Sequence, residues 1–391
     1  MADATRISNV ARRIVETFDG GERVCAIVSA RGDTTEDLIR LALEVSPHPS
    51  SREMDMLLSA GERISCALVA MAVERLGRPA VSFTGAQAGI LTDTAHGRAE
   101  ILEVRAHRVQ EALDRGEIAL VAGFQGISTD DQVTTLGKGG SDTSAVALAH
   151  ALSAEVCEIY TDVDGVCTAN PSVVAGAVRL PTVTFDEMIE LTAAGAEVLA
   201  MRSVVLAKRH RLPIRVLSSF TRAEGTLVTG QVTAPERICG VAYTTDELVL
   251  TVRATGKRLA SQCVSDALLV GGVTPRCSAR ERDGAFSLSI AKEDALKAEE
   301  VLSALQVSVP LSCTSDTDLA RVSVVGGAVH TDRAIRETAI GVLERFDFAC
   351  RWTFASRLCL SCFVPAKRVE DVVYALHEAL RPGESSWRPI S

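Results

Sequence analysis

The sequence has few aromatic residues and no long apolar run. Phe, Trp and Tyr make up 4% of the 391 residues, so Ala, Val, Leu and Ile must fill the core, as they do where helices cover buried parallel strands. No stretch approaches the ~18 apolar residues that a membrane span needs, and the start, MADATRISNVARR, lacks the apolar region of a secretory signal. We therefore expect a cytoplasmic protein that does not enter a membrane.

Basic charge and metal-binding patterns are also missing. The chain has 41 Lys and Arg against 50 Asp and Glu, a net charge of −9, which argues against nucleic acid or an anionic membrane as the partner. The 11 cysteines are irregularly spaced, with one CxxC pair, Cys359 and Cys362, and the seven histidines form no HExxH arrangement. We predict no disulfide framework and no protein-held metal, and we favour a small molecule or another protein as partner.

Helical and strand patterns alternate over the first 230 residues. Apolar residues at helical spacing predict helices over 7–18 and 54–76, the second beginning near Met54, and Thr34 or Thr35 is expected to cap a helix between them. The continuous apolar run 118–122 is typical of a strand buried on both faces. We predict an α/β domain over 1–230 with a mainly parallel sheet and with ligands at the carboxyl ends of its strands.

The pattern changes after the Gly-, Thr- and Pro-containing stretch 221–236. Strands and helices then follow in the order βαββα twice, over 248–305 and 320–380. Repeats of this size and order predict two ferredoxin-like modules, over 237–316 and 317–391.

Four segments carry chemistry. LGKGGSD, residues 136–142, has glycines that let backbone N–H groups approach an anion at the start of a helix, although the same residues also suit a tight turn without a ligand. It is neither a Walker A motif nor GxGxxG. TDVDGV (161–166) and SARGDTTED (29–37) follow predicted strands, and Glu62 lies in a predicted helix. Each alone also fits a solvated turn or surface, but their convergence on one strand edge predicts a site.

Six segments together resemble the aspartate kinase family, in order and spacing, over roughly residues 5–230. They are SARGDTTEDL, LLSAGERIS, SFTGAQAGILTD, LVAGFQGIS, TTLGKGGSDTSAVALAHAL and EIYTDVDGVCTANP. The resemblance implies an amino-acid-kinase fold followed by tandem ACT modules. It implies transfer of the ATP γ-phosphoryl group to the side-chain carboxylate of L-aspartate, with Mg²⁺ arriving on ATP.

The resemblance also implies roles for individual residues. It places the L-aspartate pocket at Ser29, Thr35, Glu62, Lys138, Gly139, Gly140, Ser141 and Asp142. It places the nucleotide over Thr161, Asp162, Cys167, Thr168, Ala169, Asn170, Pro171, Ser172 and Glu197. Glu62 suits the substrate ammonium, Lys138 suits its carboxylate, and the Gly-loop N–H groups suit the phosphoryl oxygens, with Lys138 and Asp142 as the catalytic residues. A carboxylate is already a nucleophile at pH 7, so no general base is needed.

The chain departs from the family at several positions. It lacks the opening strand that ends Lys-(Phe/Tyr)-Gly-Gly-(Thr/Ser), whose lysine binds phosphates. Met1 stands where valine is usual, and GTG encodes valine but also serves as a start codon, so we expect that strand to be encoded upstream. Cys167, Asn170 and Ser172 replace Tyr, Asp and Arg, Glu197 replaces a lysine, and Lys138 replaces an arginine. These changes weaken the expected affinity for ATP.

Three functions remain in competition. The leading one is an aspartate kinase at the first step toward lysine, threonine and methionine, assembled as a homo-oligomer through its ACT-like modules. The second is a catalytically impaired paralogue that acts as a ligand-binding or regulatory subunit. The third is a kinase of another acidic amino acid. Because 253–275 lacks the usual Pro-Gly and Asn-(Ile/Val)-Asp sequences, we also expect weak or absent end-product inhibition.

Overall fold

The computed structural model describes residues 3–230, 237–254, 260–280, 285–306, 311–346 and 353–384. The chain forms two compact units, Met1–Gly165 with Glu197–Gly230, and Val166–Ala196 with Gln231–Ser391. This division differs from the predicted domain 1–230, because residues 166–196 join the second unit. Ala169 and Val174 explain the difference, since they are buried in the same apolar core as the C-terminal strands and helices.

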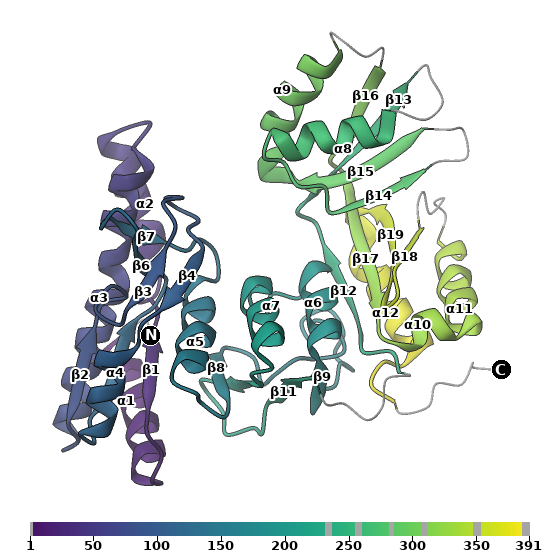
Figure 1. Cartoon of the computed structure of the whole chain (residues 1–391). Coiled ribbons are helices and arrows are strands. Elements are labelled where there is room, and N and C mark those ends of the chain that lie inside the picture. Colours follow the sequence, from purple (N-terminus) through teal and green to yellow (C-terminus); the bar gives the residue numbers. More distant parts are fainter. Residues whose placement is uncertain are drawn as a thin grey trace. The chain divides into compact units, whose positions relative to one another are not determined.

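The first unit alternates helices and strands (Figure 1). Its helices are α1 Ala4–Asp19, α2 Thr34–Val45, α3 Ser51–Arg75, α4 His107–Asp114, α5 Gly140–Ala151 and α7 Met201–His210. Its strands are β1 Cys25–Val28, β2 Ala80–Phe83, β3 Ile90–Thr92, β4 Ile101–Val104, β5 Ile118–Ala122, β6 Gln125–Ser128, β7 Val133–Thr135, β8 Cys157–Thr161, β10 Ile214–Ser218 and β11 Thr226–Thr229. The predicted α/β class with mainly parallel strands is confirmed.

Strand β5 lies between β1 and β2 and is parallel to both. All five of its residues are buried, as its continuous apolar run predicts. Strand β10 pairs in parallel with β8 and antiparallel with β11, and β4, β3, β6 and β7 form a further sheet. Among the strands that the structure describes, β1 pairs only with β5.

The amphipathic helix predicted at the beginning of the chain is α1. Its residues Ile7, Ala11 and Val15 are buried in one core with α3, β1 and β5. On another side of α1, Arg13 donates hydrogen bonds to the backbone oxygens of Ser218 and Thr221, at 2.6 and 3.0 Å. Helix α1 therefore contacts both the β1–β5–β2 sheet and the end of β10.

Two local expectations in this unit need correction. Neither Thr34 nor Thr35 caps α2, because Asp33 occupies the N-cap position and its side chain makes no capping hydrogen bond. Helix α3 is long and apolar enough to cross a membrane by length and composition alone, which the sequence analysis did not anticipate. Its polar residues Asp55 and Glu62 are nevertheless buried and hydrogen-bonded within the unit, so α3 is a core helix.

The second unit contains two antiparallel sheets with helices (Figure 1). Its helices are α6 Phe185–Ala193, α8 Ala260–Val270, η1 Lys292–Asp294, α9 Ala295–Gln306, α10 Ala328–Thr331, α11 Arg333–Glu344, η2 Ala366–Arg368 and α12 Val369–Leu380. Its strands are β9 Thr182–Thr184, β12 Gly240–Thr244, β13 Glu247–Ala254, β14 Cys277–Arg280, β15 Phe286–Ala291, β16 Leu311–Asp316, β17 Leu319–Val325, β18 Thr353–Ala355 and β19 Cys359–Pro365.

Each sheet corresponds to one predicted module, except that one strand predicted for the first module belongs to the second. The strand order β14–β15–β13–β16 is that of a complete βαββαβ module, whereas the other sheet has the order β12–β17–β19–β18. Strand β12 precedes the first module in sequence but pairs with β17, from Gly240 opposite Val325 to Thr244 opposite Arg321. The predicted boundary at 237 is therefore wrong for β12, which completes the second module. Residues 257–259 of a predicted helix and Trp352 lie outside the described residues.

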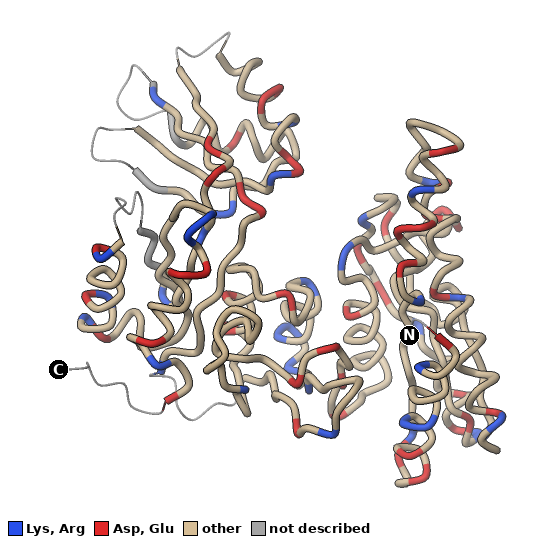
Figure 2. The backbone as a smooth tube through the Cα atoms, turned by 180° about the vertical axis from the view of Figure 1, so that it is seen from behind, with Lys and Arg blue, Asp and Glu red and all other residues tan. Residues whose placement is uncertain are grey.

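A buried ion pair connects the two modules. Glu247 at the start of β13 is fully buried, and Arg321 in β17 donates to it at 2.8 Å. Arg321 also donates to the backbone oxygen of Ala193 at the end of α6. Elsewhere Figure 2 shows acidic and basic residues following one another along the helices, as in the exposed pair of Arg40 and Asp37 on α2.

Candidate active site

The Gly loop joins β7 to α5 and depends on glycine at two positions. Gly137 and Gly139 have φ of 75° and 72°, in the left-handed region that glycine adopts without strain. A Cβ on Gly139 would lie 2.2 Å from the Cβ of Ala200. No side chain caps α5, whose N-cap residue is Gly139 itself. The Gly140 N–H donates to the Gly137 backbone oxygen at 2.9 Å, and because no side chain caps the first turn of α5, this helix start suits an anionic ligand.

Asp142 connects the N-termini of two helices. Its Oδ2 in the first turn of α5 accepts a hydrogen bond from the backbone N–H of Ala200, the N-cap residue of α7, at 3.2 Å. Burial raises the pKa of Asp142, and the Ala200 N–H partly opposes this. The carboxyl group therefore fixes the Gly loop against the start of α7.

Glu62 holds a buried carboxyl oxygen that has no partner. Its side chain is 3% exposed, and its Oε1 accepts from the backbone N–H of Ala30, at 3.2 Å, while its Oε2 has no hydrogen-bond partner. Burial raises the pKa of Glu62, and the backbone hydrogen bonds oppose the rise. An orphaned buried acceptor is unfavourable unless a ligand supplies a donor.

The expected residues Ser29 and Thr35 belong to the segment next to Glu62. Ser29 directly precedes Ala30 and is exposed at the end of β1, and Thr35 is half-buried in the first turn of α2. A Cβ on Gly61 would lie 3.0 Å from the Cβ of Ala30 and 3.5 Å from Cγ2 of Thr34. Glycine at 61 thus lets α3 approach this segment closely.

Lys138 and Glu197, two positions that depart from the family pattern, contact each other. The Lys138 Nζ donates to Oε1 of Glu197 at 2.8 Å, and their side chains are 90% and 78% exposed. An exposed pair of this kind is weak and opens easily. Ser141 lies on the same loop, and its Oγ is 2.9 Å from where a Cβ on Gly123 would sit.

The residues expected at the nucleotide fall in both units. Thr161 and Asp162 end β8 in the first unit, where the Thr161 Oγ1 donates to Asp162 and the Thr161 backbone oxygen accepts from Ser219 N–H at 2.7 Å. Segment 167–172 belongs to the second unit. Cys167 is half-buried there, and Asn170, Pro171 and Ser172 are exposed, with Asn170 Oδ1 accepting from Ser172.

Two residues of that segment, Thr168 and Ala169, have their side chains in the core of the second unit. Thr168 is fully buried, and its hydroxyl pairs with Nε2 of His377 at 2.9 Å and accepts from Val178 N–H. Ala169 is packed in the apolar core of the second module. Their side chains serve the core of the second unit and are not available to a ligand.

The sequence analysis missed a row of polar residues on α3. Asp55, Ser59 and Glu62 are all buried, and their i, i+4, i+7 spacing places them on one helix face. The Ser59 backbone oxygen accepts from the side chain of Gln125, at 2.9 Å. Polar residues at helical spacing within an otherwise apolar helix were the signal that could have revealed them.

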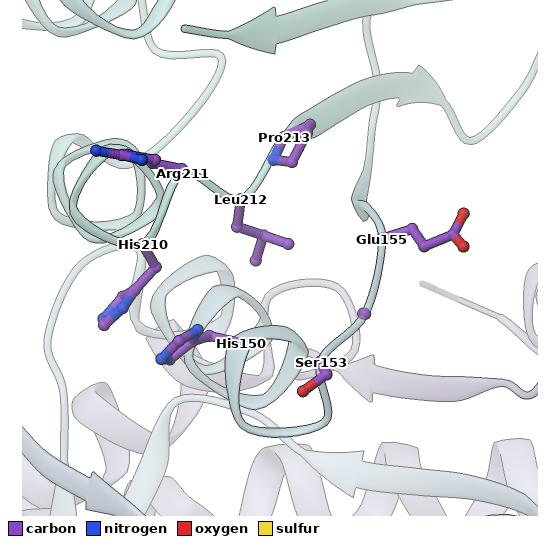
Figure 3. Close-up of a pocket in the computed structure, with 8 residues that line it drawn as sticks. His150, Ser153, Glu155, His210, Arg211, Leu212 and Pro213 are labelled. Carbon is purple, nitrogen blue, oxygen red and sulfur yellow. The ribbon is translucent and has the colours of Figure 1, made fainter.

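Two cavities in the first unit lie away from these residues. A cavity of about 560 Å³ lies between α3 and the end of β2, with Arg63, Phe83 and Gln87 among its lining residues. Another, of about 210 Å³, lies at the C-terminal ends of α5 and α7. There the rings of His150 and His210 stack with centroids 3.6 Å apart (Figure 3).

Comparison with known proteins shows the family of this chain. Residues 1–218 match the amino acid kinase family. The aspartokinase of Mycolicibacterium smegmatis is 43% identical over 98% of this chain and 94% of its own, and that of Corynebacterium glutamicum is 41% identical with the same coverage. The structure of E. coli aspartokinase III in complex with aspartate and ADP (R-state) matches with a TM-score of 0.84 at 25% identity, covering 96% of each chain. The chain therefore belongs to the aspartokinase family, within the amino acid kinase family.

Proposed function

We propose that this protein is an aspartate kinase, which transfers the γ-phosphoryl group of ATP to the side-chain carboxylate of L-aspartate and releases ADP and 4-phospho-L-aspartate. The observation that carries the proposal is the unpartnered Oε2 of Glu62, buried beside the end of β1. A buried anionic oxygen of this kind suits an ammonium group. The E. coli relative that resembles this chain in fold was solved with aspartate and ADP.

The residues of the first unit divide the work of binding. Glu62 binds the substrate ammonium through Oε2, because its Oε1 is already occupied by Ala30. Lys138 binds the α-carboxylate once its exposed contact with Glu197 opens. The side-chain carboxylate of the substrate is the nucleophile and is ionised at neutral pH, so no residue has to remove a proton.

The Gly loop supplies charge stabilisation to the transferring group. Its backbone N–H groups at the start of α5 face anions, and α5 adds the positive end of its dipole. Asp142 keeps this loop in place through its hydrogen bond to Ala200. Ser29 and Thr35 offer hydroxyl groups on the opposite segment, and Thr161 and Asp162 extend the site toward the nucleotide.

Mg²⁺ neutralises phosphate charge when it is bound with ATP. Among the residues that the structure describes, no group of three or more His, Cys, Asp or Glu side chains could hold an ion.

We further propose a cytoplasmic homo-oligomer, paired through the ACT-like modules, that acts at the first step of lysine and threonine biosynthesis. The modules retain their apolar cores, which include Leu248 and Leu250 in one and Val322 and Val324 in the other. Light scattering coupled to size-exclusion chromatography tests the assembly, and a monomeric mass at micromolar concentration contradicts it.

A second candidate function is a catalytically impaired regulatory subunit. The observation that favours it is the contact of Lys138 with Glu197, which occupies a cation of the site. Ser172 supports it further, because it supplies no cation where the family has an arginine.

The decisive experiment measures ADP release with L-aspartate and traps the acyl phosphate with hydroxylamine as a hydroxamate. We expect both signals to require L-aspartate and ATP together. D-aspartate and L-glutamate are run in parallel, and a preference for L-glutamate supports the kinase of another acidic amino acid. Aspartate binding by calorimetry without turnover supports the regulatory subunit, and absence of both binding and turnover contradicts the proposal.

A further inference from the structure

Asp55 is a buried carboxylate that the proposed mechanism does not use. It lies near the start of α3 with a fully buried side chain. Its oxygens accept hydrogen bonds from Thr135 Oγ1 at 2.5 Å, from the backbone N–H of Gly97 at 3.0 and 3.2 Å, and from Nδ1 of His96 at 2.6 Å. We assign the hydrogen of this contact to His96 Nδ1, because the Asp55 oxygens also accept from Thr135 and Gly97. Donors from three residues therefore hold this buried carboxylate in one position.

The partners of Asp55 lie on the two segments that shape the Gly loop. Thr135 is the last residue of β7, and its backbone oxygen accepts from Ala99 N–H at 2.9 Å. The backbone oxygen of Gly97 lies 3.1 Å from where a Cβ on Gly137 would sit. The segment 96–99 therefore supports the Gly loop from one side, and Asp55 joins that segment to the root of the loop.

Helix α7 also contacts residues 135–137, the root of the Gly loop. Arg202 donates to the backbone oxygen of Leu136 at 2.8 Å. The root at 135–137 is thus fixed by contacts from α3, from segment 96–99 and from α7, whereas the loop residue Lys138 is exposed. Among these contacts, only those of Asp55 reach the loop from the helix that also carries Glu62.

Asp55 can influence the site because it lies on α3, the helix that also carries Glu62. Asp55 and Glu62 are seven residues apart on one face of α3, a separation of about 10 Å along the helix axis. Between them, Ser59 holds Gln125. One rigid helix face therefore contacts the segment of Ala30, the segment of Gln125 and the Gly loop.

We infer that Asp55 and His96 are positioning residues that set the Gly loop relative to Glu62, with Thr135 as the link to the loop. The inference rests on the proposed function for its effect on catalysis, but its structural part does not. His96 is 21% exposed over a fully buried Asp55, so its ring also covers the carboxylate from water. Loss of the hydrogen-bond donor of His96 or Thr135 makes the Gly loop more mobile and weakens substrate binding.

Matched substitutions separate the hydrogen bonds from packing. Thr135→Val keeps the shape but removes the hydroxyl donor, and Thr135→Ser keeps the donor. His96→Phe keeps a ring but removes the donor, and His96→Asn keeps an N–H near the position of Nδ1. A purely structural role predicts equal effects within each pair or an effect on melting temperature alone.

The test combines hydrogen exchange of the loop amides 136–143 with aspartate KM, ATP KM and aspartate affinity by calorimetry. We expect Thr135→Val and His96→Phe to speed loop exchange and raise aspartate KM about tenfold, since a hydrogen bond to a charged group is lost. Thr135→Ser and His96→Asn should stay near wild type in loop exchange and in aspartate KM.

The outcomes distinguish the two proposals. Unchanged loop exchange in Thr135→Val and His96→Phe overturns the positioning role, whatever the activity. Loop exchange that rises as expected in a protein that neither binds nor phosphorylates L-aspartate overturns the proposed function and leaves the positioning role standing.

Discussion

The ammonium nitrogen of Lys138 lies 2.8 Å from Oε1 of Glu197, so two residues that each depart from the aspartokinase pattern compensate one another. The cation that should meet the substrate carboxylate is shared with a side chain of the same protein. Because both side chains are largely exposed, water and salt screen the contact and a substrate can displace it.

Glu197→Gln should lower the KM for aspartate and for ATP, because it removes the negative charge that contacts Lys138 and that lies beside the phosphates. The change should not exceed about fivefold at low salt, and should shrink at 0.5 M salt, where screening lengths are only a few ångströms. Steady-state kinetics at two salt concentrations measure it.

Glu155→Gln is the matched control for that change, since Glu155 is exposed and lies at the far end of α5. Glu197→Lys removes the same repulsion toward ATP and should also lower the ATP KM, but it places a second cation beside Lys138. A KM for ATP that is equal in the wild type and in both Glu197 variants would mean that Glu197 does not face the nucleotide.

Glu62→Gln should weaken aspartate binding while stabilising the protein. The variant keeps the shape but loses the charge that holds the ammonium, so the aspartate KM should rise about 10- to 100-fold. The pKa of Glu62 is raised by burial, so the folded state holds its proton more tightly than the unfolded state. The charged form therefore costs stability, and this cost appears as pH rises through the raised pKa.

The stability part of that prediction is read from thermal melts without ligand. At pH 7.5 Glu62→Gln should melt higher than the wild type, by ~2–4 °C for each ~1 kcal/mol of relief. The difference should vanish toward pH 4, where the wild-type carboxyl is also protonated. A variant that melts lower at pH 7.5 would show that Oε2 has a partner in solution.

Local patterns predicted the elements well because helices and buried strands depend on nearby residues. The run 118–122 is a fully buried strand, and the last helix of the repeat predicted over 320–380 is α12, which ends at Leu380. The position of β12 in the second module could not be predicted from nearby residues. Its pairing with β17 joins residues about 80 positions apart, and the sequence of a short apolar strand does not specify its neighbour.

The site likewise contains residues that the local sequence reveals and residues that depend on contacts between distant segments. The Gly loop and Glu62 have recognisable local sequence, and the structure gives Gly137 and Gly139 a left-handed backbone and buries Glu62. The contacts of Asp55 with His96 and Thr135 span 41 and 80 residues, and no local motif announces them. Thr168 lies in a segment whose sequence resembles a nucleotide-binding segment, and the contact of its hydroxyl with His377 spans 209 residues and has no local signal either.

His210 should make the protein less stable at mildly acidic pH. Its pKa is lowered by burial and by the nearby His150 and Arg209, so the folded state prefers the neutral ring. A depressed pKa contributes stability above the unfolded value of 6.5, and that contribution is lost as pH falls toward the folded value. His210→Gln should therefore flatten the decline in melting temperature between pH 7.5 and 5.5, by about 1–2 °C.

The exposed His107 on α4 provides the control for this titration. His107→Gln removes one imidazole far from the stacked rings and should leave the decline as in the wild type. If His107→Gln and His210→Gln flatten the curve equally, the stacked pair is not the source of the pH dependence.

Arg321→Met should destabilise the second unit strongly, because it leaves the fully buried Glu247 without its closest cation. Breaking a buried pair from one side costs about 3–5 kcal/mol. Arg276 lies 3.6 Å from the same carboxylate and should limit the loss to the lower part of that range.

Glu247→Gln with Arg321→Met removes both charges and should recover most of the stability, since a neutral pair needs no buried counter-ion. Urea unfolding followed by a probe in the second unit measures all three proteins. A double variant no more stable than Arg321→Met alone would show that the hydrogen bond of Arg321 to the Ala193 oxygen, and not its charge, holds the modules to α6.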